Sequence, residues 1–259
     1  MKDFELHHGD MLDVLPTLAK GSVAMVFADL PYGLLKNRAW DLPIPLSQFW
    51  QALYRIVSSA YTVAMTASML FASTLVQSNL ARFRYDLVWQ KHLASNFMMA
   101  KKRPLCFHEN VLIFGVNSAP YIPQMRPESE RVDIRQNNYK SQKKSTGWHG
   151  QNTTIGNNMK GPMYPKSIII THEDRKNNIH PTQKPVALLE WLIATYTNPG
   201  DTVLDPCFGS NTTGVACARL GRKYIGIEKD AEYFRIGKER LEREVGAMRN
   251  GPTQGRLAV

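Results

Sequence analysis

The stretch that decides the fold runs from Thr202 to Gly214 and reads TVLDPCFGSNTTG. Its apolar start, ending in Asp205, predicts a short buried strand, and the residues from Thr213 to Leu220 predict a helix. A strand, a glycine-containing loop and a helix N-terminus together predict a pocket whose free backbone N–H groups bind the polar end of a ligand.

A second acid, Glu228, ends the next predicted strand, Lys223 to Glu228. A carboxylate at that place in a βαβ unit accepts both hydroxyls of an adenosine ribose. This spacing favours a nucleoside cofactor without saying which one. The alternative interpretation is a tight turn followed by an acidic surface residue.

The chemistry of the loop narrows the choice of cofactor. The chain lacks both the dinucleotide fingerprint GxGxxG and the phosphate-binding pattern GxxxxGK[ST]. Asp205 adds a carboxylate that suits a ligand ammonium better than a pyrophosphate. S-adenosylmethionine, with an ammonium, a sulfonium and a ribose, matches this polarity.

Outward from this stretch, predicted strands and helices alternate along the chain. Strands are expected at 4–8, 22–28, 61–70, 85–89, 111–114, 167–170, 202–205 and 223–228, and helices at 11–18, 49–57, 71–82, 186–196, 213–220 and 231–245. The pattern predicts an α/β fold, a Rossmann-like, doubly wound and mostly parallel sheet with helices on both faces.

The strand at 22–28 delivers a second motif, Asp29-Leu30-Pro31-Tyr32. This motif suits chemistry on the exocyclic amino group of a nucleic-acid base. Such a group is a poor nucleophile, because its lone pair is delocalised into the ring, and it needs acceptors that hold its N–H groups. The Asp29 carboxylate and the Leu30 carbonyl are candidate acceptors for its two N–H bonds, and Pro31 restricts the Leu30 backbone. Tyr32 is suited to stack on a base drawn out of a duplex. Taken alone, the tetrapeptide also fits a plain strand-ending turn.

Composition indicates a polyanionic partner. The formal net charge is +10, which favours binding to nucleic acid, although a merely basic soluble surface gives the same count. The three cysteines show no CxxC spacing and the histidines no HExxH pattern, so we expect no disulfide framework and no metal. Without a long apolar run, we expect no membrane span and a cytoplasmic protein.

The predicted organisation is one core interrupted by an insert. Residues 1–115 form the catalytic half, 116–166 an irregular insert, 167–247 the cofactor-binding half and 248–259 a flexible tail. The insert is polar and basic with interleaved aromatic residues, which suits target recognition, and a solvated loop is the alternative. The cations predicted to contact DNA are Lys91, Lys101, Lys102, Arg103, Arg126, Arg135, Lys143 and Lys144.

In these motifs the chain resembles the β-class amino-methyltransferases of DNA, in which the catalytic tetrapeptide precedes the target-recognition region and the cofactor loop follows it. The resemblance covers residues 3 to 240. It is carried by Gly9-Asp10, Asp29 to Tyr32, Trp89-Gln-Lys91, Arg103 to Glu109, His180-Pro-Thr-Gln-Lys-Pro185, Asp205 to Thr213 and Glu228.

The resemblance implies a seven-stranded sheet, S-adenosylmethionine as cofactor and DNA as partner. It further implies that Phe208, Gly209 and Ser210 line the cofactor loop, that Glu228 takes the ribose hydroxyls and that Asp10 reads the cofactor adenine. The methionyl end is then approached by His180, Thr182 and Lys184. A homodimer is plausible from the family only, and pairing with a restriction endonuclease is left open.

Two positions depart from the family pattern. Leu30 stands where the family usually has a first proline, and Asn211 stands where it usually has glycine. Because the acceptor at position 30 is a backbone carbonyl, we expect the chemistry to survive. If position 211 needs a positive φ, asparagine is one of the few residues that tolerate it.

The leading hypothesis is a site-specific adenine-N6 DNA methyltransferase, because Asp rather than Ser stands at position 29. A cytosine-N4 enzyme is the nearest alternative, and a catalytically weak DNA-binding homologue is a second. Methylation of RNA or of a protein glutamine is disfavoured, because the glutamine enzymes normally place the cofactor loop before the tetrapeptide.

Overall fold

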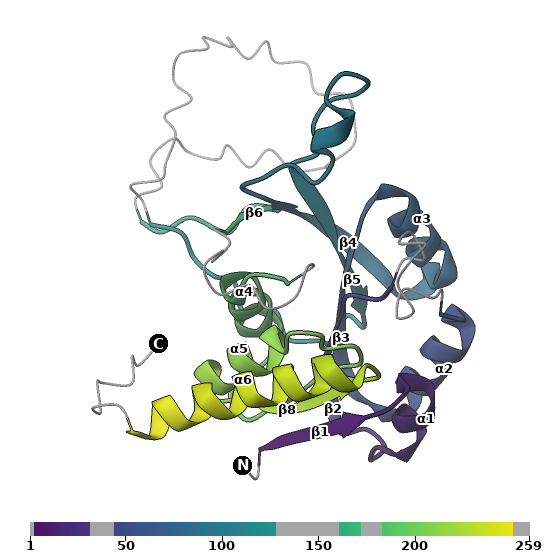
Figure 1. The fold of residues 1–259 in the computed structure, drawn as a ribbon, viewed down its shortest axis with the longest axis vertical. Coiled ribbons are helices and arrows are strands. Elements are labelled where there is room, and N and C mark those ends of the chain that lie inside the picture. The colour runs from purple at the N-terminus through teal and green to yellow at the C-terminus, as the bar shows by residue number, and fades with distance from the viewer. Residues whose placement is uncertain (1–2, 32–43, 128–160, 172–182, 251–259) are drawn as a thin grey trace, which may run out of the picture. The chain divides into compact units, whose positions relative to one another are not determined.

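The computed structural model describes residues 3–31, 44–127, 161–171 and 183–250 (Figure 1). The chain divides into two compact units, one made of Met1–Ile122 with Ser167–Val259 and the other of Pro123–Lys166. The smaller unit falls within residues 116–166, and the division into an insert and two halves of one core stays a prediction.

The larger unit is built on one eight-stranded sheet with the order β1-β8-β7-β2-β3-β5-β4-β6. Neighbouring strands are parallel, except that β5 is antiparallel to both β3 and β4. The strands are β1 (Phe4–His8), β2 (Val23–Ala28), β3 (Val57–Ala67), β4 (Phe83–Gln90), β5 (His108–Gly115), β6 (Ile168–Ile170), β7 (Thr202–Asp205) and β8 (Lys223–Glu228).

The expectation of seven strands is wrong by one. The short strand β6 pairs with the outer edge of β4, with Val88 opposite Ile168 and Gln90 opposite Ile170, and so joins the same sheet. The strand expected at 61–70 is β3, which runs from Val57 to Ala67, because the chain enters a helix at Met69.

Helices cover both faces of the sheet. Figure 1 shows α1 (Met11–Val14), α2 (Leu46–Ile56) and α3 (Met69–Ser78) on one side, and α4 (Val186–Tyr196), α5 (Thr212–Leu220) and α6 (Ala231–Asn250) on the other. Helix α6 continues to Asn250, beyond its expected end near Val245 and into the predicted tail.

Alternating side chains of the central strands explain the two layers. In β2, Val26 and Ala28 belong to the core cluster with α2, whereas Met25 and Phe27 belong to the cluster with α4. Successive strand residues point to opposite faces, so a strand that is apolar throughout is buried on both. This confirms the predicted doubly wound α/β class.

The parallel strands bring the predicted polar residues to one edge. β1, β2, β7 and β8 run in the same direction, and His8 pairs with Glu228 in register. Asp10, Asp29, Asp205 and Glu228 therefore lie at or just beyond the carboxyl ends of adjacent strands. Between β7 and β2 the chain order reverses, which is where open α/β sheets bind ligands. None of the helices described is long and apolar enough to span a lipid bilayer.

Candidate active site

The loop from Asp205 to Asn211 has a backbone that depends on unusual conformations. Gly209 has φ 51° and Asn211 φ 59°, both in the left-handed region. The expectation that asparagine occupies a position of positive φ is confirmed. Asn211 is also anchored, because its side-chain amide donates to the carbonyl of Gly237 at 3.1 Å.

Close packing against β8 and α6 holds the same loop. A Cβ on Gly237 of α6 would lie 2.7 Å from the Phe208 ring and 2.9 Å from the Gly209 carbonyl oxygen. A Cβ on Gly226 of β8 would lie 2.8 Å from the Phe208 ring. Since real Cβ atoms do not approach so closely, both glycines are needed for this position of the loop.

Asp205 is a buried carboxylate at the start of the loop. Its Oδ2 accepts from the Thr213 hydroxyl at 2.5 Å and its Oδ1 from the Cys207 backbone N–H at 3.1 Å. Burial raises its pKa to about 7, with those two hydrogen bonds opposing and the charges of Asp29 and Glu228 adding to the rise. Within the described residues, no lysine or arginine lies at ion-pair distance from it.

Glu228 lies across the loop at the end of β8. Its two carboxylate oxygens accept from the backbone N–H groups of Gly209 and Asp230, each at 2.8 Å. Burial raises its pKa, and these two hydrogen bonds oppose the rise. Each oxygen keeps a lone pair for a further donor.

Asp10 caps α1 beside Glu228. Its Oδ1 accepts from the Leu12 backbone N–H at 2.9 Å, and its Oδ2 pairs with the ammonium of Lys229 at 2.9 Å. Burial acts to raise the pKa of Asp10, but these two partners outweigh it and the pKa is lowered. The carboxylates predicted to bind the cofactor are thus brought together.

Asp29 is held from two sides where β2 ends. One carboxylate oxygen accepts from the hydroxyl of Thr66 on β3, and the other pairs with the ammonium of Lys184 at 2.5 Å. The Cys207 thiol donates to the Asp29 backbone carbonyl at 3.3 Å. The predicted catalytic tetrapeptide and the predicted cofactor loop are therefore in direct contact, although they lie far apart in the sequence.

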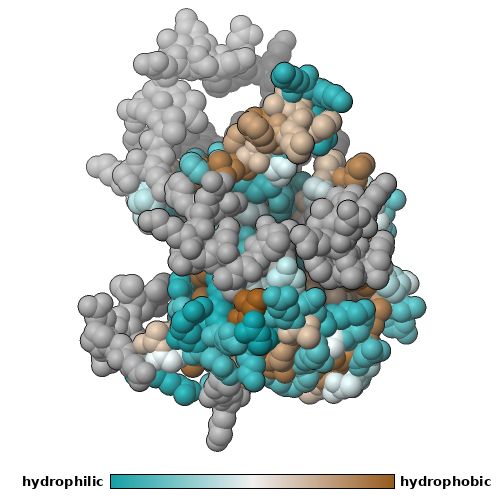
Figure 2. Space-filling model, viewed as in Figure 1, coloured by the Kyte–Doolittle hydropathy of each residue, from teal (hydrophilic) through white to brown (hydrophobic). Residues whose placement is uncertain are grey.

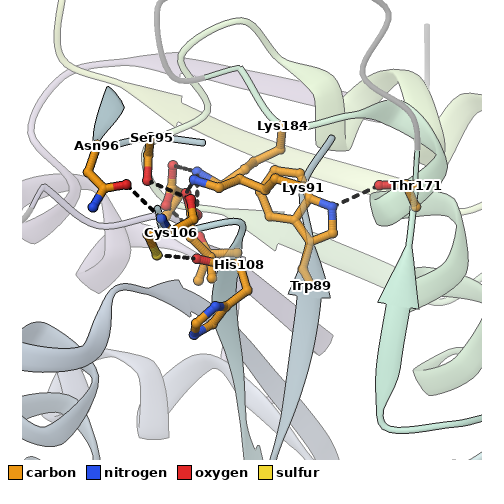
Figure 3. A network of polar contacts seen from close by, with 11 residues as sticks. Trp89, Lys91, Ser95, Asn96, Cys106, His108, Thr171 and Lys184 are labelled. Atoms are coloured by element: carbon orange, nitrogen blue, oxygen red, sulfur yellow. Dashed lines mark hydrogen bonds and ion pairs between the residues drawn. The ribbon is translucent and has the colours of Figure 1, made fainter. Parts of the chain in front are cut away.

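Lys184 belongs to a chain of buried and partly buried charges (Figure 3). Its ammonium lies 3.7 Å from Glu109 Oε2, and Glu109 Oε1 accepts from Lys91 at 2.8 Å. Burial acts to lower the pKa of Lys184, but the carboxylates of Asp29 and Glu109 outweigh it and the pKa is raised. A cation is thus held directly beside Asp29.

This chain of charges gives the surroundings of two residues with predicted binding roles. Lys91 was expected to contact DNA; it is 8% exposed and paired with Glu109, and its contact with DNA stays a prediction. Lys184 was expected at the methionyl end of the cofactor, which stays a prediction, and its described partners within the chain are Asp29 and Glu109. Thr66 was missed at the sequence level, and Glu109 was noted without a role, because only the strand register shows them facing Asp29 and Lys184.

The rest of the tetrapeptide is partly described. The Leu30 side chain is 2% exposed and packs in the core cluster with α2. Burial of this side chain fixes the backbone where the family usually has a proline. Tyr32, His180 and Thr182 lie outside the described residues.

The other predicted DNA contacts divide into three groups. Lys101, Lys102 and Arg103 are exposed between β4 and β5. Arg126 bridges to Met163 within the smaller unit and donates to the Tyr164 carbonyl at 3.1 Å. Arg135, Lys143 and Lys144 lie outside the described residues. In the part of the chain that is described, no cluster of three or more His, Cys, Asp or Glu residues is arranged to hold a metal ion.

Comparison with known proteins identifies the family. A profile of the DNA methylase family matches residues 23–239. The DNA adenine methyltransferase YhdJ of Escherichia coli strain K12 is 31% identical over 258 residues, covering 91% of this chain and 81% of the relative. The Type II methyltransferase M.HpaI of Haemophilus parainfluenzae is 27% identical, covering 93% and 75%. The chain therefore belongs to the N6/N4 DNA methylase family.

Solved structures agree with the fold. The M1.HpyAVI–SAM complex superposes with a TM-score of 0.61 at 24% identity, over 92% of this chain and 100% of that one. The cytosine-N4-specific PvuII DNA methyltransferase gives 0.64 at 16% identity, over 96% and 94%. The protein is a DNA methyltransferase, and S-adenosylmethionine is the cofactor of its family.

Proposed function

We propose that this protein methylates N6 of adenine at a specific DNA sequence. The observation that carries the proposal is the carboxylate of Asp29, held by Thr66 and Lys184, on a residue whose backbone carbonyl accepts from Cys207 of the predicted cofactor loop. A carboxylate at this position accepts a hydrogen bond from an N–H of the target amino group and stabilises the positive charge that develops on the nitrogen. The adenine activity in the name of YhdJ supports the same choice of base.

The buried carboxylates fit S-adenosylmethionine. Asp205 suits the ammonium of the methionyl end, because its own partners are a hydroxyl and a backbone N–H and not a cation. Glu228 keeps acceptor capacity for the ribose hydroxyls, and Asp10 lies beside it for the adenine amino group. When bound, the cofactor supplies an electrophilic methyl group on its sulfonium sulfur.

The residues of the chain position the target for this methyl transfer. In our proposal, the adenine leaves the duplex, Tyr32 stacks on it, and the two N–H bonds point to the Asp29 carboxylate and the Leu30 carbonyl. Thr66 and Lys184 restrict the Asp29 side chain, and the buried Leu30 side chain restricts its carbonyl. Catalysis then rests on positioning and electrostatics, and a misplacement of 1 Å costs about 100-fold in rate.

Target recognition is assigned to residues 116–166 in our proposal. The arginines and lysines interleaved with aromatic residues in this segment support the assignment. Replacing the segment with that of a relative of different specificity should change the methylated sequence. Unchanged specificity in such a hybrid would refute the assignment.

We further propose that the protein works in the cytoplasm, in keeping with its three free cysteines. The homodimer and the cognate restriction endonuclease stay predictions from the sequence. Analytical ultracentrifugation of the purified protein checks the predicted homodimer.

Mass spectrometry of nucleosides tests the choice of base. Unmethylated plasmid DNA is treated with the protein and S-adenosylmethionine and then digested to nucleosides, with a matched RNA sample in parallel. We expect 6-methyladenine from DNA and no methylated nucleoside from RNA. The detection of 4-methylcytosine without 6-methyladenine would overturn the adenine assignment, and sequencing the modified positions gives the recognition site.

A further inference from the structure

The hairpin tip, residues 91–107 between β4 and β5, carries exposed apolar side chains beside a basic run. Phe97 is 75% exposed and Met98 97% exposed. The run Lys101-Lys102-Arg103 follows at once, and the tip contains neither aspartate nor glutamate. Figure 2 shows this hydrophobic surface directly beside strongly hydrophilic surface at the upper end of the described residues.

The tip has a defined structure. The Asn96 side chain accepts from the Cys106 backbone N–H at 2.6 Å (Figure 3). It also donates to the Pro104 carbonyl at 3.1 Å. Phe97–Met99 form a short 3-10 helix, and the Lys102 N–H donates to the Met99 carbonyl at 2.8 Å. Phe97 and Met98 are therefore held out into solvent by a folded turn.

The tip lies at the catalytic edge of the sheet. β4 ends and β5 begins at the edge where β2 delivers Asp29, since Ala67 of β3 pairs with Asn110 of β5. Lys91 and Glu109 pair at the base of the tip, and Glu109 contacts Lys184, the partner of Asp29. The tip extends beyond the ends of β4 and β5 from this point (Figure 1).

We propose that Phe97 and Met98 form an apolar wedge that enters the DNA base stack next to the target base. Phenylalanine and methionine are among the side chains that proteins insert between base steps. Drawing a base out of the duplex breaks its stacking, and an apolar side chain in the gap restores contacts that the neighbouring bases have lost. Lys101, Lys102 and Arg103 contact the flanking phosphates.

DNA rather than a protein surface is the occupant that the charges favour. Three cations and no carboxylate surround the apolar pair, which complements a polyanion. The inference rests on DNA as the substrate of the proposed function and not on the identity of the methylated base.

The experiment compares two duplexes that carry the methylated site. In one the target base is normally paired, and in the other it stands opposite an abasic position, where leaving the stack costs less. The variant is Phe97→Ala with Met98→Ala, and the control is Leu80→Ala. Leu80 is also exposed, at 69%, but precedes the start of β4 at the opposite edge of the sheet.

On the paired duplex, the double variant should lose about tenfold or more in methylation rate, corresponding to the loss of about one stacked base. On the abasic duplex, its rate should approach that of the unchanged protein. Leu80→Ala should leave both rates unchanged. Met98→Gln, at a side chain that is 97% exposed, removes part of the wedge without disturbing any core packing and should give the same pattern.

Three outcomes would refute the proposal that Phe97 and Met98 act as a wedge. Equal losses on both duplexes would mean general DNA binding, and unchanged rates would mean no role. A change of oligomeric state with unchanged rates would mean that the tip covers a second copy of the chain. Finding methylated cytosine would refute the adenine assignment but not the wedge. The ratio of the rates on the paired and abasic duplexes does not depend on which base carries the methyl group.

Discussion

The cofactor loop and the hairpin tip lie at the same edge of the sheet but are built in opposite ways. Asp205, Phe208, Ser210 and Asn211 are buried, and the loop is fixed by glycine contacts and backbone hydrogen bonds. The tip presents Phe97 and Met98 to solvent. A small ligand of constant shape suits a site formed in advance, whereas the surface that we propose for DNA becomes buried only in the complex.

Between these two regions lies the Asp29–Lys184 pair, and the first prediction removes its cation. Lys184→Met should lower the rate of methyl transfer about 100-fold, because Asp29 loses a partner that restricts its position. The affinity for S-adenosylmethionine, measured by calorimetry, should change little. A large loss of cofactor affinity at unchanged turnover would instead place Lys184 at the methionyl end. Lys20→Met, at an exposed lysine outside the site, is the control for lost charge.

The second prediction concerns the buried carboxylate of the loop. Asp205→Asn should weaken cofactor binding by about 10- to 100-fold, the usual effect of losing a charged hydrogen bond. In the unchanged protein, affinity should rise as the pH increases through about 7, where Asp205 ionises. Calorimetric titration from pH 6 to 8 checks both, and an equally steep rise in Asp205→Asn would contradict the assignment.

The same group gives a signed dependence of stability on pH. The pKa of Asp205 rises from 3.8 to about 7 on folding, so the folded protein binds this proton more tightly than the unfolded chain. Its contribution to stability is fully present below pH 3.8 and is lost as the pH rises to about 7. Asp205→Asn should remove this component from denaturant unfolding curves measured across that range.

The third prediction compares two glycines of α6, one that packs against the cofactor loop and one that does not. Gly237→Ala places a Cβ 2.7 Å from the Phe208 ring and should destabilise the protein by about 1–3 kcal/mol and weaken cofactor binding. Gly246→Ala lies in the same helix, where a Cβ meets nothing within 4 Å, and should stabilise the protein by up to about 1 kcal/mol. Equal effects of the two changes on cofactor affinity would contradict the packing argument.

The smallest expected effect belongs to the basic run of the tip. Lys101→Gln and Lys102→Gln should each lower DNA affinity only a few-fold, about equally for specific and unrelated duplexes, since phosphates carry no sequence information directly. Each should reduce the slope of log affinity against log salt by about 1. A slope equal to that of the unchanged protein would remove these residues from the DNA contacts.

The fold was largely predictable from the sequence, because apolar strands buried on both faces and turn residues at their ends are local signals. The strands Phe4–His8, Thr202–Asp205 and Lys223–Glu228 were predicted with their observed bounds. The positive φ at Asn211 was likewise expected from the residue type.

The contacts around Asp29 were not predictable. The Thr66 hydroxyl reaches Asp29 only because β3 pairs with β2 in a particular register. Lys91 was predicted as a DNA contact from its basic stretch, and only the antiparallel pairing of β4 with β5 shows that it is buried against Glu109. Such pairings join segments distant in the sequence, and no local pattern encodes them.

The most direct test of the account replaces Asp29 itself and measures methyl transfer and cofactor binding on the same protein sample. Asp29→Ala should abolish methylation of DNA while S-adenosylmethionine still binds, and thermal unfolding confirms that the variant is folded. In Asp29→Ala, the buried Lys184 has lost its partner Asp29, and the double variant Asp29→Ala with Lys184→Met removes that unpaired charge. The double variant should also be inactive, because the Asp29 carboxylate itself is required. Methylation by Asp29→Ala at the rate of the unchanged protein would contradict the proposed mechanism.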